Sequence, residues 1–362
     1  MRVLVISNMY PAPQAPTFGI FVRNQVEQLQ AHELDITVAA IRDPRNGKAN
    51  VLKKYARWVL GTMTRFSTRY DLVHAHYAFP SGWLAKLYSK IRRVPYIVTV
   101  HGGDLNKMAK KGAFFKKQTK SILKNAAHVI AVGPALYEEI IQEYGVSEDR
   151  VSLINMGVNR NVFHQRTDVP SPFDKEKKHI LFAGNIIKQK GITELISAFH
   201  QLYEDDPKLQ LHLVGSFQSE AYKEQIVNQI EGMHLPKEAV LFHGPKTQDE
   251  LAIHMTYADV FVLPSHIEGF GLVVLESMSC GTPVVASNVG GLPSLLSDEA
   301  GVLIEPEQPE SLKRGIDAVL YDESLRKQLV QAGYKKADAN ETEKIIARIL
   351  TIYNDTTKRD VS

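Results

Sequence analysis

Short runs of consecutive apolar residues, rich in β-branched side chains, recur along the first half of the chain. They occupy residues 3–7, 36–41, 72–75, 96–100, 129–132 and 151–154, and stretches with helical spacing, such as 21–30, separate most of them. A strand that is apolar throughout is buried on both faces, which is typical of a parallel sheet covered by helices. The pattern therefore predicts a doubly wound α/β domain.

The same pattern restarts after a polar segment that contains Pro170, Pro172 and a run of lysines. Further apolar runs follow at residues 180–183, 211–214, 240–242, 260–263, 284–286 and 302–304. We therefore expect two Rossmann-like domains with parallel sheets, residues 1–165 and 179–340, joined by a linker at 166–178. An amphipathic segment predicts a C-terminal helix within 341–362, with the hypothesis that it crosses back to the N-terminal domain. Facing each other, two such domains would enclose a cleft lined by the loops that follow the strands.

Composition narrows the class of protein. The chain has 362 residues, a length that suits two domains, and its single cysteine, Cys280, cannot form an internal disulfide. Because no stretch of 18 apolar residues occurs, we expect a cytoplasmic protein without a transmembrane helix. The formal net charge of +3 is too small to indicate nucleic-acid binding. The pattern G-x-G-x-x-G is absent from the first loop, which argues against a nicotinamide enzyme.

The most informative loop follows the predicted strand at residues 260–263 and contains Glu268-Gly269-Phe270-Gly271, after which a helical pattern begins. Glycines let the backbone approach a ligand closely, and the start of a helix offers unpaired N–H groups to a phosphate. Glu276 lies about one turn into the predicted helix. A carboxylate accepts hydrogen bonds from two neighbouring hydroxyls, so Glu268 and Glu276 could bind a sugar and a ribose.

The segment from Glu268 to Ser287, together with Gly290-Gly291-Leu292-Pro293, resembles the signature of the retaining glycosyltransferases of family 4, which have the two-domain GT-B architecture. The resemblance implies that Glu276 binds the ribose hydroxyls of a nucleotide and that Glu268 contacts the donor sugar. It also implies that backbone groups of Phe270, Gly271 and Leu272 approach the sugar and the diphosphate.

The resemblance extends to the loop that begins at Gly184. The family usually has an arginine after this glycine and a lysine six residues after it, and both neutralise the diphosphate. This chain keeps Lys190 but has Asn185 in place of the arginine. Lys190 and helix N-termini would then have to supply the missing charge, with Lys188 or a basic residue from elsewhere in the chain as a further candidate. Gly215 and Gly244, each at a predicted strand end, are expected near the nucleotide base.

In the N-terminal domain, the resemblance implies that Gly19 approaches the diphosphate and that His101, at a predicted strand end, faces the donor sugar. Asp104 and His76 are weaker candidates for the acceptor side. His74 and His76 lie on one face of a predicted strand, but no third ligand lies nearby in sequence, so we predict no metal site.

A lysine-rich segment at residues 107–124 carries seven lysines with Met108, Phe114 and Phe115 and no acidic residue. Three interpretations remain open: a solvated helix face, attachment to an anionic membrane surface, or steering of an anionic lipid acceptor. Attachment would place the protein at the inner face of the cell membrane.

The expected function is transfer of a sugar, with retention at the anomeric carbon, from a nucleoside diphosphate sugar to a hydroxyl acceptor. We expect a UDP-sugar as donor, a lipid-linked glycan of a cell-surface polysaccharide as acceptor, and no metal or other cofactor. No second carboxylate is placed to act as a nucleophile, which favours a front-face reaction. The alternatives are a nucleotide-sugar epimerase of the same architecture and a non-catalytic nucleotide-sugar-binding protein.

Overall fold

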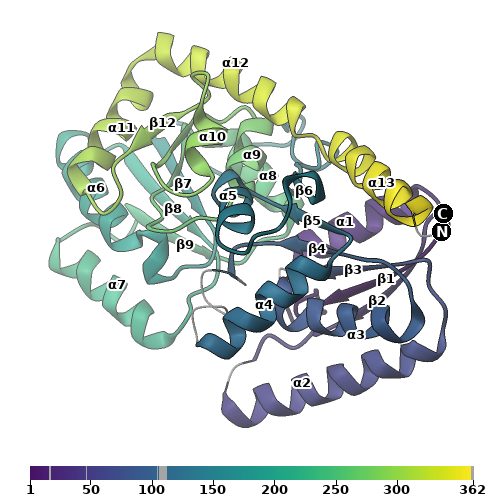
Figure 1. Ribbon diagram of the computed structural model, residues 1–362. Coiled ribbons are helices and arrows are strands. Elements are labelled where there is room, and N and C mark those ends of the chain that lie inside the picture. Colours follow the sequence, from purple (N-terminus) through teal and green to yellow (C-terminus); the bar gives the residue numbers. More distant parts are fainter. Residues whose placement is uncertain (16–17, 46, 104, 106–111, 360–362) are drawn as a thin grey trace. The chain divides into compact units, whose positions relative to one another are not determined.

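The structure is a computed structural model that describes residues 1–15, 18–45, 47–103, 105 and 112–359. The chain forms two compact units (Figure 1). The first contains residues 1–156 and 342–362, and the second contains residues 157–341.

The first unit has a six-stranded, fully parallel sheet in the order β2-β1-β3-β4-β5-β6. Helices follow most of its strands, as the sequence pattern predicted. The strands are β1 (Arg2–Ser7), β2 (Asp35–Ala40), β3 (Leu72–His76), β4 (Tyr96–Val100), β5 (His128–Ala131) and β6 (Val151–Leu153). The helices are α1 (Ile20–Ala31), α2 (Lys48–Met63), α3 (Trp83–Arg92), α4 (Ala113–Asn125), α5 (Pro134–Gln142) and α13 (Thr342–Arg359).

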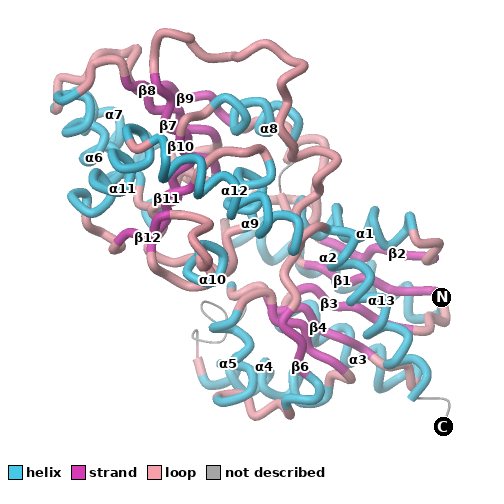
Figure 2. Tube along the Cα trace, turned by 90° about the horizontal axis from the view of Figure 1, so that it is seen from above, coloured by secondary structure: helices cyan, strands magenta, loops and turns pink. Residues whose placement is uncertain are grey.

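The second unit repeats this architecture with the strand order β12-β11-β10-β7-β8-β9 (Figure 2). Its strands are β7 (Lys178–Ala183), β8 (Leu209–Val214), β9 (Val240–Gly244), β10 (Val260–Leu263), β11 (Val284–Ser287) and β12 (Val302–Ile304). Its helices are α6 (Ile192–Asp205), α7 (Glu220–Gly232), α8 (Gln248–Tyr257), α9 (Leu272–Ser279), α10 (Leu292–Leu296), α11 (Pro309–Tyr321) and α12 (Glu323–Ala339). The two sheets confirm the prediction of two doubly wound α/β domains.

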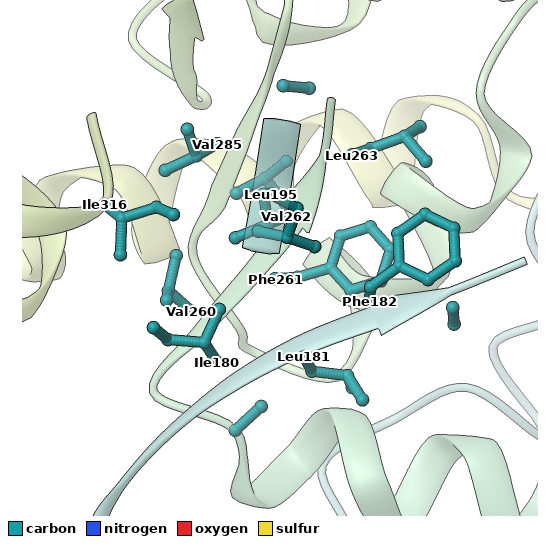
Figure 3. Close-up of a cluster of buried hydrophobic side chains, with 14 of the residues drawn as sticks. Ile180, Leu181, Phe182, Leu195, Val260, Phe261, Val262, Leu263, Val285 and Ile316 are labelled. Carbon is teal, nitrogen blue, oxygen red and sulfur yellow. The ribbon is translucent and has the colours of Figure 1, made fainter. Parts of the chain in front are cut away.

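The core of the second unit combines strand side chains, buried on both faces of the sheet, with side chains of the flanking helices such as Leu195 and Ile316 (Figure 3). Ile180 and Phe182 on β7 and Phe261 on β10 are fully buried between the flanking helices. This burial explains why the strands are apolar at consecutive positions rather than at alternate ones. The loops, which carry the polar residues, are thereby held at the strand ends.

The boundaries between the units differ from those expected from the sequence. Residues 157–178, which include the predicted linker at 166–178, belong to the second unit because Phe163 and Phe173 are buried in its core. Proline and lysine indicated an exposed connection, but the two phenylalanines anchor it. At the other end, α13 packs against α1, and its Ile346 and Tyr353 are buried in the core of the first unit.

Candidate functional site

The order of the strands reverses at one place in each sheet. In the second unit the chain runs outward from β7 through β8 to β9 and then returns to place β10 on the other side of β7. Loops at such a reversal leave in opposite directions and open a crevice at the carboxyl ends of the strands, where ligands bind in open α/β sheets. The loops after β7 and β10 contain Lys190 and Glu268 respectively.

An ion pair joins these two loops. Lys190 ends a short 3-10 turn after β7, and its Nζ lies 2.5 Å from Oε2 of Glu268. The other carboxylate oxygen of Glu268 accepts a hydrogen bond from the backbone N–H of Gly269 at 3.1 Å. Both side chains are half-buried. The structure thus brings together a cation and a carboxylate that are 78 residues apart in the sequence.

Gly290 packs directly against the backbone of Glu268. It adopts a left-handed conformation, with φ of 56°, and a Cβ built on it would lie 1.7 Å from the carbonyl oxygen of Glu268. Only glycine avoids both this clash and the strain of a positive φ. Gly290 and the neighbouring Gly291 therefore let the loop between β11 and α10 pack directly against the backbone of the Glu268 loop.

The N-terminus of α9 lies in the same loop. Gly271 is the N-cap residue, and no side chain that the structure describes caps the helix, so the first N–H groups of the helix, including that of Leu272, have no side-chain acceptor among the described residues. Phe270, just before the cap, is half-buried against the core. Unpaired N–H groups and the positive end of a helix dipole form a binding site for an anion such as a phosphate.

Glu276 lies on α9, five positions beyond the cap, and is half-buried. Its carboxyl group makes no hydrogen bond or ion pair with any residue that the structure describes. Desolvation raises the pKa of Glu276 to about 8. A half-buried carboxyl group without a partner is costly to keep in a fold unless it serves a ligand.

The glycines at neighbouring strand ends also lie together. The N–H of Gly184 donates to the carbonyl of Val214 at 3.0 Å, and the N–H of Gly215 donates to the carbonyl of Gly244 at 2.9 Å. Gly184, Gly215 and Gly244 therefore mark the carboxyl ends of β7, β8 and β9 respectively. Asn185 is exposed in the first of these loops.

One pair beside this site was missed in the sequence. Nε2 of His266, in the loop after β10, lies 3.1 Å from Oε1 of Glu194, in the first turn of α6. Both side chains are half-buried, and the N–H of His266 donates to the carbonyl of Gln189 at 2.9 Å. The pair thus links α6 to the Glu268 loop, and the backbone hydrogen bond links the Lys190 loop to the Glu268 loop. The sequence signal for this pair was Glu194, an acidic residue in the first turn of a helix.

In the first unit, His101 follows β4 within a group of rings. Its Nε2 lies 3.1 Å from Nδ1 of His76, and its ring contacts Phe21 and Tyr77 with centroid separations of 5.0 and 4.6 Å. Burial, together with the neighbouring His76, lowers the pKa of His101 well below its usual value. His101 is therefore a neutral imidazole at physiological pH. Asp104 lies outside the described residues.

His74 and His76 do share one face of β3, with ring centroids 4.5 Å apart. Both nitrogens of His74 have partners, because Nδ1 lies 2.7 Å from the Tyr353 hydroxyl and Nε2 lies 2.7 Å from Oγ1 of Thr99. Within the described ranges, no group of three or more histidine, cysteine, aspartate or glutamate side chains is arranged to hold a metal ion.

Gly19 lies in the loop after β1 as the N-cap residue of α1, with φ of 72°. A Cβ there would lie 2.7 Å from the backbone carbonyl of Met9. The backbone at Gly19 therefore packs directly against the backbone at Met9, and a side chain at Gly19 would force the two segments of the loop apart.

The described part of the lysine-rich segment, residues 112–124, forms most of α4. Phe114 is exposed, whereas Phe115 packs against Phe79 with ring centroids 5.5 Å apart. Lys116 lies 3.5 Å from Glu143. Among the helices that the structure describes, none is both long and apolar enough to cross a membrane.

Comparison with known proteins agrees with this geometry. Residues 164–336 match the family described as Glycosyl transferases group 1, and residues 18–162 match Glycosyltransferase Family 4. The chain is 27% identical to the putative teichuronic acid biosynthesis glycosyltransferase TuaC of Bacillus subtilis, over 94% of each chain. It is 31% identical to a D-inositol 3-phosphate glycosyltransferase of Streptosporangium roseum, over 79% of this chain and 69% of the other.

Among solved structures, sucrose-phosphate synthase from Thermosynechococcus elongatus superimposes with a TM-score of 0.80 at 25% identity, over 98% of each chain. The similarity covers both units and therefore supports the GT-B fold that the sequence predicted. The chain belongs to the Glycosyl transferases group 1 family, and it is a glycosyltransferase.

Proposed function

We propose that the chain is a retaining transferase that moves a sugar from a nucleoside diphosphate sugar to a hydroxyl acceptor. UDP is the first nucleotide to test as the carrier of the donor sugar. The observation that carries the proposal is the grouping of Lys190, Glu268, the uncapped start of α9 and the unpartnered Glu276 at one strand-order reversal. A cation and a helix N-terminus suit a diphosphate, and carboxylates suit hydroxyl groups.

In this account the donor diphosphate binds the N–H groups at the start of α9 and draws Lys190 away from Glu268. Freed from the ion pair, Glu268 accepts hydrogen bonds from the sugar, while Glu276 accepts them from the ribose. Because Lys190 and the helix dipole stabilise the negative charge that develops on the departing phosphate, the C–O bond of the donor weakens. The acceptor hydroxyl attacks from the face that the diphosphate leaves, and its proton passes to the diphosphate.

The same positive groups lead us to propose that transfer needs no divalent ion. Lys190 and the start of α9 would supply the charge that a metal supplies elsewhere. Full activity in the presence of a chelator is the expected result. A strict need for a divalent ion that persists after Lys190→Ala would contradict this part of the proposal.

For the acceptor, we propose a lipid-linked glycan intermediate of a cell-surface polysaccharide. The support is the relative named for teichuronic acid biosynthesis, which matches the chain over nearly its whole length. The other relative is named for D-inositol 3-phosphate, which is a small soluble compound. Membrane extracts and soluble polyols should therefore be compared as acceptors.

The test is slow hydrolysis of the donor without acceptor, measured as release of nucleoside diphosphate from a panel of nucleotide sugars. We expect Lys190→Ala and Glu268→Ala to lower the rate about 100-fold, the range seen for loss of one transition-state donor. Lys208→Ala is the matched control, because Lys208 is exposed and lies directly before β8, at the amino end of the strand and away from the loops that form the site. Equal losses in the Lys208 and Lys190 variants, or no hydrolysis of any nucleotide sugar, would refute the proposal.

A further inference from the structure

Helix α2 of the first unit exposes a stripe of apolar side chains. Leu52, Leu60 and Met63 are 75%, 66% and 44% exposed, and Ala56 between them is also exposed. Spacings of three, four and seven residues place these side chains on one side of the helix. Single exposed apolar residues are normal on a protein surface and need no explanation. A continuous apolar stripe on the outer side of a surface helix does need one.

The opposite side of α2 is fixed on the sheet, so the stripe cannot turn inward. Trp58 is buried, and its Nε1 donates a hydrogen bond to the carbonyl of Ala39 on β2 at 3.0 Å. Thr62 is also buried one turn later. In Figure 1 α2 runs along the lower margin of the first unit.

A basic pocket of about 1050 Å³ borders α2, between the helix and the loop that follows β2. Its lining includes five cationic residues: Arg42, Arg45, Lys54, Arg57 and Arg65. Among the described lining residues the only acidic one is Asp43, and its carboxylate is paired with Arg45 at 2.7 Å. The pocket therefore carries a net positive charge.

Some of these cations hold the loop, and others are free. Lys54 donates to the carbonyl oxygens of Asp43 and Arg45 at 3.0 and 2.7 Å, which ties the loop to the helix. Arg57 and its neighbour Lys53, both exposed, make no hydrogen bond or ion pair with any described residue. On a helix, Lys53 and Arg57 lie one turn apart and directly beside the apolar stripe. The free charges thus separate the stripe from the pocket.

We propose that α2 and the pocket beside it dock onto an anionic phospholipid membrane surface. The apolar stripe enters the boundary between headgroups and acyl chains, and Lys53 and Arg57 pair with lipid phosphates, one of which occupies the pocket. A helix with leucines on one side and cations beside them lies in the membrane interface in this way. The attraction comes from apolar burial together with the negative potential of the lipid surface.

This surface fits a membrane better than the described part of the lysine-rich segment does. On α4, Phe114 is the only large apolar side chain that is exposed, and Lys116 is already paired with Glu143. The α4 lysines, Lys117 and Lys120, nevertheless provide a matched control, because they are exposed and carry the same charge as Lys53 and Arg57.

The experiment is flotation of the full chain with vesicles of phosphatidylcholine alone or mixed with phosphatidylglycerol. We expect binding to the anionic vesicles only. Lys53→Gln/Arg57→Gln should weaken binding about 25-fold, at about fivefold per charge removed. Leu52→Ser/Leu60→Ser should weaken it at least about tenfold through lost apolar burial. All four positions are exposed, so folding should be preserved, as circular dichroism would verify.

The affinity of Lys117→Gln/Lys120→Gln for anionic vesicles should be within about twofold of that of the unchanged chain. This α4 variant loses the same charge as the α2 variant, but only the α2 charges border the apolar stripe. Loss of binding in this α4 variant but not in the α2 variants would overturn the proposal. Failure of the unchanged chain to bind anionic vesicles would also overturn it, as would full displacement by glycerol phosphate, which would indicate a site for a free anion. Donor hydrolysis, measured without lipid, should be unchanged in every variant, so failure here is distinguishable from failure of the proposed function.

Discussion

Replacement of Glu276 by glutamine should stabilise the protein increasingly as the pH rises. Burial raises the pKa of Glu276 from its usual 4.5 to about 8. An acid with a raised pKa holds its proton more tightly in the folded state. Its favourable contribution is therefore fully present below pH 4.5 and is lost as the pH rises towards 8. Glutamine has nearly the same shape and no charge, so it escapes this loss.

The magnitude follows from the pKa difference. One unit corresponds to about 1.4 kcal/mol, so ionisation of Glu276 costs the folded state up to about 5 kcal/mol above pH 8. Between pH 5 and pH 8 the cost grows by about 3.5 kcal/mol. The free energy of unfolding of Glu276→Gln, relative to that of the unchanged chain, should increase by this amount over the same interval.

Denaturant unfolding of both proteins at pH 5 and pH 8 measures the effect. Glu224→Gln, on the exposed side of α7, is the matched control and should change by less than about 0.5 kcal/mol. A stability difference between Glu276→Gln and the unchanged chain that is equal at both pH values would show that the Glu276 carboxyl is well solvated. Glu276 would then need no ligand to offset the cost of its burial.

Three other substitutions test separate parts of the structure. Gly290→Ala should reduce donor hydrolysis by at least about 100-fold, because its Cβ would displace the backbone of Glu268; an active variant would contradict this. Tyr353→Phe should lower the free energy of unfolding by about 1–3 kcal/mol, because buried His74 loses its partner; thermal unfolding at pH 7 measures this loss. Burial lowers the pKa of His212 to about 2, so its contribution is present above pH 6.5 and is lost as the pH falls. His212→Leu should therefore reduce the stability loss between pH 6.5 and 4.5 by about 2 kcal/mol, as denaturant unfolding would measure, and an unchanged loss would refute the assignment.

The sheets could be predicted because short apolar runs recur along the chain and mark the strands, a signal that depends on nothing distant in the sequence. The extent of each unit could not be predicted in the same way. Phe163 and Phe173 anchor a segment whose prolines and lysines resemble a linker, and their burial depends on contacts with the distant core. Local composition carries no information about such contacts.

The site shows the same division. Glu268, Gly271 and Glu276 could be selected because a strand, a glycine loop and a helix start follow one another in the sequence. The contacts of Lys190 with Glu268 and of His266 with Glu194 depend on two loops meeting at the strand-order reversal. The exposed stripe on α2 was also missed, because the sequence alone does not show which side of an amphipathic helix faces the sheet.

In the proposed function, the loops after β7 and β10 bind a nucleoside diphosphate through Lys190 and the start of α9. Calorimetric titration of nucleoside mono- and diphosphates of each base into the unchanged chain and into Lys190→Ala measures this binding. We predict that one diphosphate binds at least about tenfold more tightly than its monophosphate, and that Lys190→Ala removes most of this preference, since a hydrogen bond to a charged group contributes about 1.5–3 kcal/mol. Equal affinity for the two phosphates, or a preference that survives Lys190→Ala, would contradict the account.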